Sequence, residues 1–143
     1  KLAEVLGTPD RVLLGDGANG TCLAARGFHR QPYDLANLQA PDLVVQVHLD
    51  YLKAGSDFIE TNTYSANRFK LEAKQIPAEE ATVFDLNKAG AELANKAVAA
   101  LQDGSTRYVL GAIGPVGKHL EPIGPIPKTE AFEAFQEQAK GLV

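Results

Sequence analysis

The residues best suited to bind a ligand lie in a glycine-rich segment near the start of the chain. The sequence GDGANGT at residues 15–21 directly follows an apolar run at residues 11–14, which predicts a buried strand. Glycines at the carboxyl end of a strand let a ligand approach the main chain, and they tolerate positive φ angles. One carboxylate stands among their N–H groups. The segment is therefore a candidate site for a small polar ligand, formed by Asp16, Gly17, Ala18, Asn19 and Gly20.

The same glycines also have the spacing of a dinucleotide-binding loop, GxGxxG, after a predicted strand. Such a site needs an acid about 20 residues later, at the tip of a second strand. Asp34 has about this spacing, but it lies in QPYD, which predicts a turn. Asp16 would also place a negative charge against the pyrophosphate. Glycine N–H groups beside a carboxylate suit a zwitterion better than a phosphate.

A second polar cluster follows the strand predicted at residues 57–63, DFIETNT. Glu60 lies within this apolar run, and a buried carboxylate is costly unless a cation or a hydrogen-bond donor meets it. One interpretation is that Glu60 binds an ammonium or another polar group of a ligand. The other is that it pairs with Arg68, Lys70 or neighbouring backbone.

Asn62 has two interpretations of equal weight, because a short amide can fix a ligand or satisfy the backbone of a turn. Thr61 and Thr63 are interpreted as structural, since β-branched residues suit a strand.

The single cysteine, Cys22, excludes a disulfide within the chain and indicates a reducing, cytoplasmic location. The three histidines, His29, His48 and His119, show no paired spacing, so no metal site is expected from this chain alone. Cys22 is interpreted as a small buried residue, and His48 as a partly exposed helical one.

Three strands are predicted, at residues 11–14, 57–63 and 107–113, and each ends in small or polar residues. Helices are predicted at residues 3–6, 21–26, 41–54, 67–74 and 79–101, and from about 129 to 143. Strands that alternate with helices predict a parallel α/β sheet with crossover helices, whose polar strand ends meet at one edge.

A closed (β/α)₈ barrel takes about 250 residues, so 143 residues would supply only its first half. We therefore expect residues 1–143 to be an incomplete domain, the first three strand–helix units of a TIM barrel. The net charge of −4, without a basic block, argues against nucleic acid. The apolar runs are shorter than the roughly 20 residues of a membrane span, so no membrane partner is expected.

Taken together, three segments resemble the homocysteine S-methyltransferase domain. They are DGANGT at 16–21, HLDYLKAGSDFIETNTYSAN at 48–67 and VLGAIGP at 109–115. Their order and spacing match across nearly the whole chain. Two positions depart from the family pattern: Asn19 stands where the family usually has methionine, and Cys22 where an apolar residue is common.

The resemblance implies a (β/α)₈ barrel that transfers a methyl group to homocysteine, whose thiol is bound to zinc as a thiolate, to give methionine. Its zinc-binding cysteines stand on later strands, outside this chain, so no catalytic or metal-binding residue is assigned here and the chain alone is expected to be inactive. By resemblance, residues 16–20 hold the amino-acid end of homocysteine, with Asp16 near the ammonium. Glu60 and Asn62 line the same rim.

Members of the family differ in the methyl donor, which is a folate, a cobalamin or a methylsulfonium compound. The sequence YSANRFKL at 64–71 favours the folate-linked forms. The expected partners are homocysteine, one of these donors and the remainder of the barrel. The alternative hypothesis is a half-barrel without catalytic activity that binds an amino acid or serves as an association module.

Overall fold

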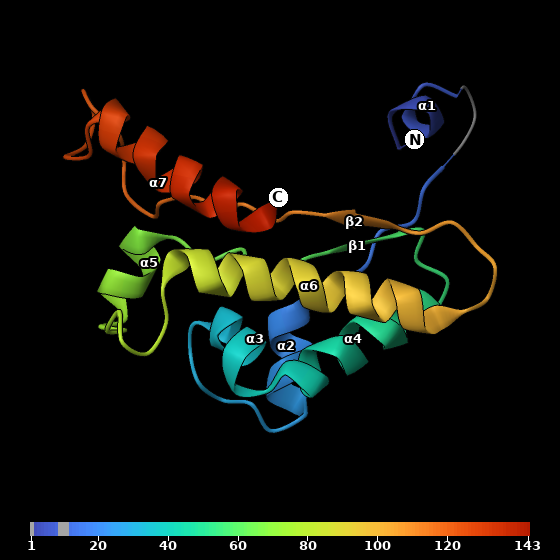
Figure 1. Cartoon of the computed structure of the whole chain (residues 1–143). Helices are drawn as coiled ribbons and strands as arrows, with labels where there is room; N and C mark the ends of the chain where they lie inside the picture. Colours follow the sequence, from blue (N-terminus) through green and yellow to red (C-terminus); the bar gives the residue numbers. More distant parts are fainter. Residues whose placement is uncertain (1, 9–11) are drawn as a thin grey trace.

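The computed structural model describes residues 2–8 and 12–143, which form a mixed α/β fold around a two-stranded sheet. Figure 1 shows the elements in chain order, with the long helix α6 beside the strands. They are α1 (Leu2–Leu6), α2 (Asn19–Ala25), the 3₁₀ helix η1 (Tyr33–Leu35), α3 (Ala36–Gln39), α4 (Pro41–Lys53), β1 (Phe58–Glu60), α5 (Arg68–Ala73), α6 (Val83–Leu101), β2 (Tyr108–Leu110) and α7 (Lys128–Leu142).

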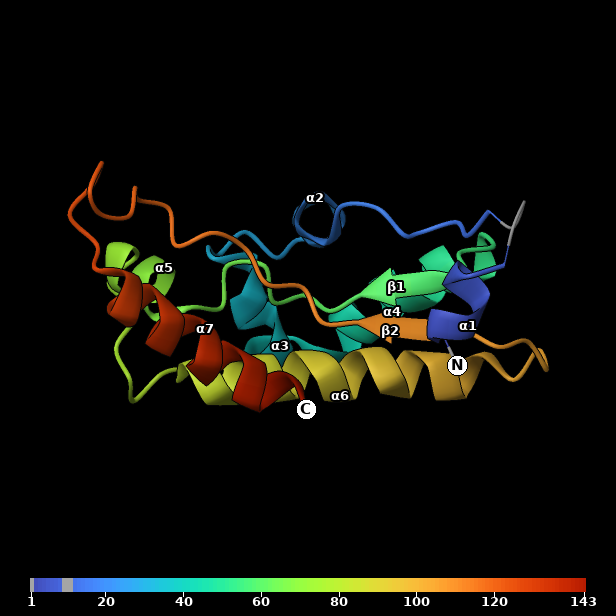
Figure 2. The ribbon, with the colours of Figure 1, turned by 90° about the horizontal axis from the view of Figure 1, so that it is seen from above.

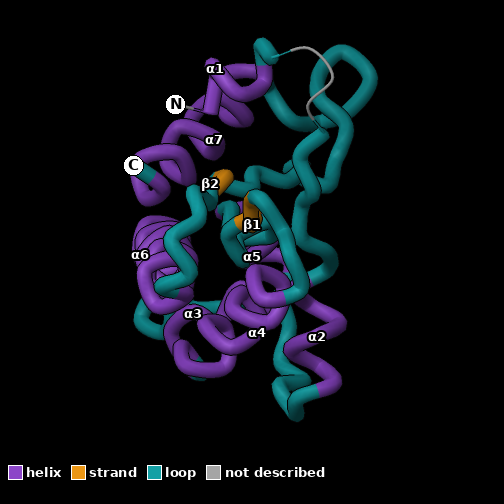
Figure 3. Tube along the Cα trace, turned by 90° about the vertical axis from the view of Figure 1, so that its right-hand side faces the viewer, coloured by secondary structure: helices purple, strands orange, loops and turns teal. Residues whose placement is uncertain are grey.

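The strands β1 and β2 pair in parallel, with Ile59 opposite Val109 and Glu60 opposite Leu110. The chain between them forms α5 and α6, so the prediction of parallel strands with crossover helices is confirmed. Figure 2 shows β2 beside the C-terminal half of α6 and α7 beside its N-terminal half; α6 also packs against α4. In Figure 3 the strands lie at the centre, with α6, α4 and α2 around them.

The first predicted strand, residues 11–14, is not a strand of the described structure. Arg11 lies outside the described residues, and pairing with β1 is limited to a single parallel bridge between Gly15 and Phe58. The carboxylate of Asp57 accepts the N–H of Leu14 at 2.8 Å. This side chain replaces the backbone carbonyl that a neighbouring strand would offer to Leu14 in a sheet. The segment still lies against β1, because the N–H of Asp16 donates to the carbonyl of Phe58 at 3.1 Å.

Both remaining strands are shorter than predicted, because threonine hydroxyls replace the ladder at their carboxyl ends. The N–H of Ala112 donates to Thr61 Oγ1 at 2.9 Å, and Thr63 Oγ1 donates to the carbonyl of Ala112 at 2.8 Å. The two hydroxyl oxygens are 2.6 Å apart. The structural interpretation of Thr61 and Thr63 is therefore confirmed, and these bonds fix the ends of β1 and β2 beside each other.

The predicted helices are present, with α2 beginning two residues earlier than predicted and α6 showing the largest displacement. Helix α6 begins at Val83, four residues later than predicted, because Thr82 caps it by accepting the N–H of Asp85 at 3.0 Å. The short helices η1 and α3 were not predicted. None of the helices in the described ranges is long and apolar enough to cross a membrane.

The prediction for His48 was wrong. His48 lies on α4 one turn from Val44 and Leu52, and all three side chains are at most 1 % exposed. Helix α4 packs against α6, which removes this face from solvent. Burial lowers the pKa of His48 to about 4.

Candidate functional site

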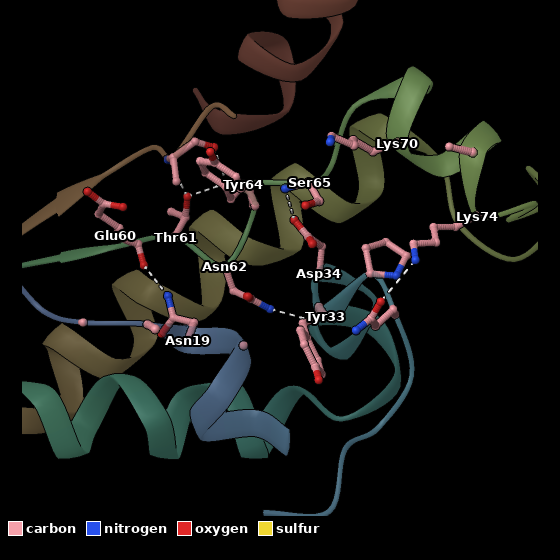
Figure 4. A pocket seen from close by; sticks show the side chains of 18 residues that line it. Asn19, Tyr33, Asp34, Glu60, Thr61, Asn62, Tyr64, Ser65, Lys70 and Lys74 are labelled. Atoms are coloured by element: carbon pink, nitrogen blue, oxygen red, sulfur yellow. Dashed lines mark hydrogen bonds between the residues drawn. The ribbon is translucent and has the colours of Figure 1, made fainter. Parts of the chain in front are cut away.

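A cavity of about 600 Å³ opens at the carboxyl ends of β1 and β2 (Figure 4). A volume of this size is in the range of small-molecule binding sites. Six of the seven residues that the sequence analysis proposed for substrate binding line the cavity: Gly17, Ala18, Asn19, Gly20, Glu60 and Asn62. The structure thus brings residues from the glycine-rich loop and from the end of β1 to one place.

Asp16 does not line the cavity but lies directly behind it. Both of its carboxylate oxygens accept the N–H of Glu60, each at 3.1 Å, which joins the loop to the last residue of β1. Burial raises the pKa of Asp16 to about 6; the hydrogen bond from Glu60 opposes this rise and the charge of Glu60 adds to it. Near neutral pH Asp16 and Glu60 together make this end of the cavity negative.

The glycines of the loop are required by close contacts with aromatic rings, and not by a left-handed backbone. A Cβ at Gly15 would lie 2.6 Å from Phe58 Cζ, one at Gly17 2.9 Å from the Tyr51 hydroxyl, and one at Gly20 2.7 Å from Tyr33 Cδ2. The positive φ angles occur at other glycines, such as Gly27 and Gly55. The tolerance of glycine for positive φ is therefore not used at Gly15, Gly17 or Gly20.

Main-chain donors of the loop are available for a ligand. The N–H groups of Gly17 and Ala18 donate to no other described residue, and both residues line the cavity. The carbonyl of Ala18 accepts the hydroxyl of Tyr51 at 3.3 Å. Asn19 Nδ2 donates to the carbonyl of Glu60 at 3.3 Å, so the loop binds both the N–H and the carbonyl of this residue of β1.

The side chain of Glu60 is exposed at the end of β1 and lines the cavity. The alternative that it pairs with Arg68 is wrong, since Arg68 instead forms ion pairs with Glu133 and with Glu137 on α7. Glu60 forms no ion pair with another described residue. A ligand in the cavity could therefore use its carboxylate.

Asn62 is buried, and its amide group is engaged in structure. Its Nδ2 donates to the carbonyl of Tyr33 at 3.0 Å and to Asn37 Oδ1 at 3.1 Å. Asn37 Nδ2 in turn donates to the carbonyl of Asn62 at 2.9 Å. These bonds hold the end of β1 to η1 and α3, which gives Asn62 a clear structural role beside its place in the cavity wall.

The sequence analysis did not assign Asp34 to the site, although Asp34 lines the cavity. Its side chain is 4 % exposed, and Oδ1 accepts the N–H of Ser65 at 2.8 Å. Burial raises the pKa of Asp34 to about 6. A dinucleotide site requires an acid at the tip of a second strand, but Asp34 lies in η1. Asp34 therefore does not meet that requirement. No periodic pattern in the sequence marks this residue as buried.

Two lysines of the cavity wall were also missed. Lys70 lies on α5 and Lys74 directly follows it, and both line the cavity opposite β1 (Figure 4). Their spacing of four residues places them on one face of the helix, which is the signal that could have identified them. Only the fold shows that this face is turned to the cavity.

Cys22 is partly buried on α2, with its sulfur 3.3 Å from the hydroxyl of Tyr51. This contact raises the pKa of Tyr51 to about 12. Across residues 2–8 and 12–143, no three His, Cys, Asp or Glu side chains gather in a way that could hold a metal ion.

Comparison with known proteins identifies the class to which this fold and site belong. The homocysteine S-methyltransferase family profile matches residues 13–143. The chain therefore belongs to the homocysteine S-methyltransferase family.

Among its relatives, the methionine synthases of Mycobacterium tuberculosis and Mycobacterium leprae are 31 % and 30 % identical over 93 % of the chain. The oxidized form of the homocysteine methyltransferase MmuM from Escherichia coli is 28 % identical, with a TM-score of 0.75 over 99 % of the chain. Its metallated form is 31 % identical, with a TM-score of 0.63 over 81 % of the chain. The chain spans 52 % of the oxidized MmuM chain and 12 % of the M. tuberculosis methionine synthase.

Proposed function

We propose that this chain is the N-terminal half of a (β/α)₈ barrel that transfers a methyl group to the thiol of homocysteine and so makes methionine. Family membership and the likeness to about half of MmuM support the proposal. The observation that carries it is the placement of Glu60 and the free N–H groups of Gly17 and Ala18 at one end of the cavity, with Asp16 behind them and bonded to the N–H of Glu60.

The geometry suits the two charges of an amino acid. The exposed carboxylate of Glu60 lines the cavity and has several acceptor sites for the ammonium. Asp16, behind the cavity wall, would lie near the ammonium and add its negative charge while it holds the N–H of Glu60. The N–H groups of Gly17 and Ala18 are donors for the carboxylate of the amino acid. The loop and the end of β1 would orient homocysteine with its side chain directed along the cavity.

A zinc ion, when bound, would supply the Lewis acid that favours the thiolate form of homocysteine at neutral pH. The described residues do not fit this ion, because Cys22 is the one cysteine and no metal-binding cluster forms around it. We propose that residues outside this chain hold the zinc, and no step of the transfer is assigned to residues of this half. The role of this half is to bind and orient the amino acid.

Calorimetric titration of homocysteine into the protein that carries this chain tests the proposal. Asp16→Asn and Glu60→Gln should each weaken binding about tenfold or more, since each removes a negative charge from the end of the cavity that would hold the ammonium. Asn at position 16 can still accept the N–H of Glu60, so the loop should keep its place. Glu92→Gln, on the exposed face of α6, is the matched control. Unchanged affinity in both site variants would remove these carboxylates from the site.

A further inference from the structure

Tyr51 lies behind the glycine-rich loop and does not line the cavity. It belongs to α4, and its ring packs against the apolar core. The hydroxyl of Tyr51 donates to the carbonyl of Ala18 at 3.3 Å. Helix α4 packs against both α2 and α6. The loop is therefore held from behind by a side chain of a helix that the core fixes in place.

The ring of Tyr51 also contacts the loop one residue earlier. A Cβ at Gly17 would lie 2.9 Å from the hydroxyl oxygen and 3.2 Å from Cε1 of Tyr51, so the ring leaves no room for a side chain there. The two contacts, at the Cα of Gly17 and at the carbonyl of Ala18, lie on either side of the planar peptide that joins these residues. That peptide carries the N–H of Ala18, which has no partner among the described residues. Tyr51 therefore fixes the direction of this donor.

The hydroxyl of Tyr51 is the link between the Ala18 carbonyl and a separate element. A carbonyl oxygen only accepts, so Tyr51 is the donor in this bond. Thr21 Oγ1 also donates to the carbonyl at 3.4 Å, but Thr21 lies in α2, which directly follows the loop and moves with it. The sulfur of Cys22 lies 3.3 Å from the Tyr51 hydroxyl and helps to keep the ring in this position.

The ammonium end of the proposed site has anchors of its own. Asp16 accepts the N–H of Glu60, and the N–H of Asp16 donates to the carbonyl of Phe58 at 3.1 Å. Both bonds go to β1, and neither involves Tyr51. A change at Tyr51 should therefore disturb the donors for the carboxylate and leave the acceptors for the ammonium in place.

Resting on the proposed function, we propose that Tyr51 is a positioning residue that presents the N–H groups of Gly17 and Ala18 to the carboxylate of the bound amino acid. Tyr51 acts without touching the ligand. Its ring and hydroxyl hold the loop in the binding conformation beforehand, so the ligand does not have to order the loop when it binds. Without the hydroxyl the peptide can rotate, and its hydrogen bonds to the carboxylate weaken. Tyr51 thereby favours thiols that carry a carboxylate over thiols that do not.

Calorimetric titration of three thiols into the protein that carries this chain tests the proposal. The thiols are homocysteine, its analogue without the carboxylate (aminopropanethiol) and its analogue without the ammonium group (mercaptobutyrate). Each is titrated into the wild type and into Tyr51→Phe, which removes the hydroxyl and keeps the ring against Gly17. Tyr108→Phe is the matched control, because Tyr108 begins β2, at the opposite end of the strands from the cavity. The thermal midpoint of each protein is measured as well.

We expect Tyr51→Phe to weaken the binding of homocysteine and of mercaptobutyrate about fivefold each, the usual effect of one hydrogen bond. The affinity for aminopropanethiol should change by less than about twofold, because this thiol has no carboxylate for the N–H groups to bind. Tyr108→Phe should bind all three thiols as the wild type does. The thermal midpoints of the two variants should agree.

The proposal is overturned if Tyr51→Phe binds homocysteine as tightly as the wild type does. It is also overturned if the substitution weakens aminopropanethiol as much as homocysteine, because Tyr51 would then support the fold and not the carboxylate donors. A wild type that binds homocysteine no better than aminopropanethiol would contradict the proposed function, on which this proposal rests. That failure appears without any variant, so the two failures are distinguishable.

Discussion

Replacing His48 by leucine should make the protein less sensitive to acid. His48 is fully buried on α4, and neither ring nitrogen has a hydrogen-bond partner among the described residues. A neutral imidazole can occupy this place, but its protonation would put an unpaired charge in the core. Leucine has a similar size and no group to protonate, so the variant should keep the packing and lose the titration.

The magnitude follows from the pKa of the imidazole. Burial lowers the pKa of His48 from 6.5 to about 4 in the folded state. Between these values the unfolded chain binds the proton and the folded chain does not, so stability is retained above pH 6.5 and is lost as the pH falls towards 4. At about 1.4 kcal/mol per pH unit the loss is about 3 kcal/mol. The leucine variant should not show this loss.

The assay is urea unfolding of the wild type and of His48→Leu at several pH values between 4 and 7.5. The free energy of unfolding of the variant minus that of the wild type should rise by about 3 kcal/mol from pH 7.5 to pH 4. Taking the difference cancels the titration of all other groups. The same substitution at His119, which is exposed, serves as the control. A difference that stays constant with pH, or that falls towards pH 4, would refute the reasoning.

Two other substitutions test the environment of the cavity. Asp34→Asn should act in the opposite sense to His48→Leu, because the pKa of Asp34 is raised from 3.8 to about 6 in the folded state. The free energy of unfolding of the wild type should therefore fall by up to about 3 kcal/mol as the pH rises through this range. The variant has no carboxyl group here and should not show this loss. Urea unfolding of both proteins at pH 4 and pH 7 checks this prediction. It would be contradicted if the free energy of unfolding differed between variant and wild type by the same amount at both pH values. Gly90→Ala should destabilise by about 1–3 kcal/mol, because the new Cβ would lie 2.5 Å from Thr63 Cγ2 and 2.8 Å from Asn37 Nδ2. An unchanged or higher thermal midpoint would show that α6 can move away at no cost.

Much of the fold could be predicted from local patterns. Proline at position 41, the apolar spacing that follows and Gly55 predicted α4 closely, since the start and the end of a helix depend on nearby residues. The apolar residues Phe58 and Ile59 predicted β1, and the parallel pairing followed from the alternation of strands and helices. The lengths of the strands could not be predicted, because the hydroxyls of Thr61 and Thr63 are 51 and 49 residues from the peptide of Ala112 that they bind.

For the site, the sequence by itself determined that the loop at 16–20 and the end of β1 supply polar groups, and that the chain resembles the family to which it belongs. Only the tertiary structure decided that Tyr33, Tyr51 and Phe58 require the glycines, and that Lys70 and Lys74 face the cavity. It alone placed His48 and Asp34 out of solvent. The physical reason is that residue type and residue spacing determine the local structure of one segment. The burial and the charge environment of a side chain depend instead on which segments, far apart in the chain, pack against one another.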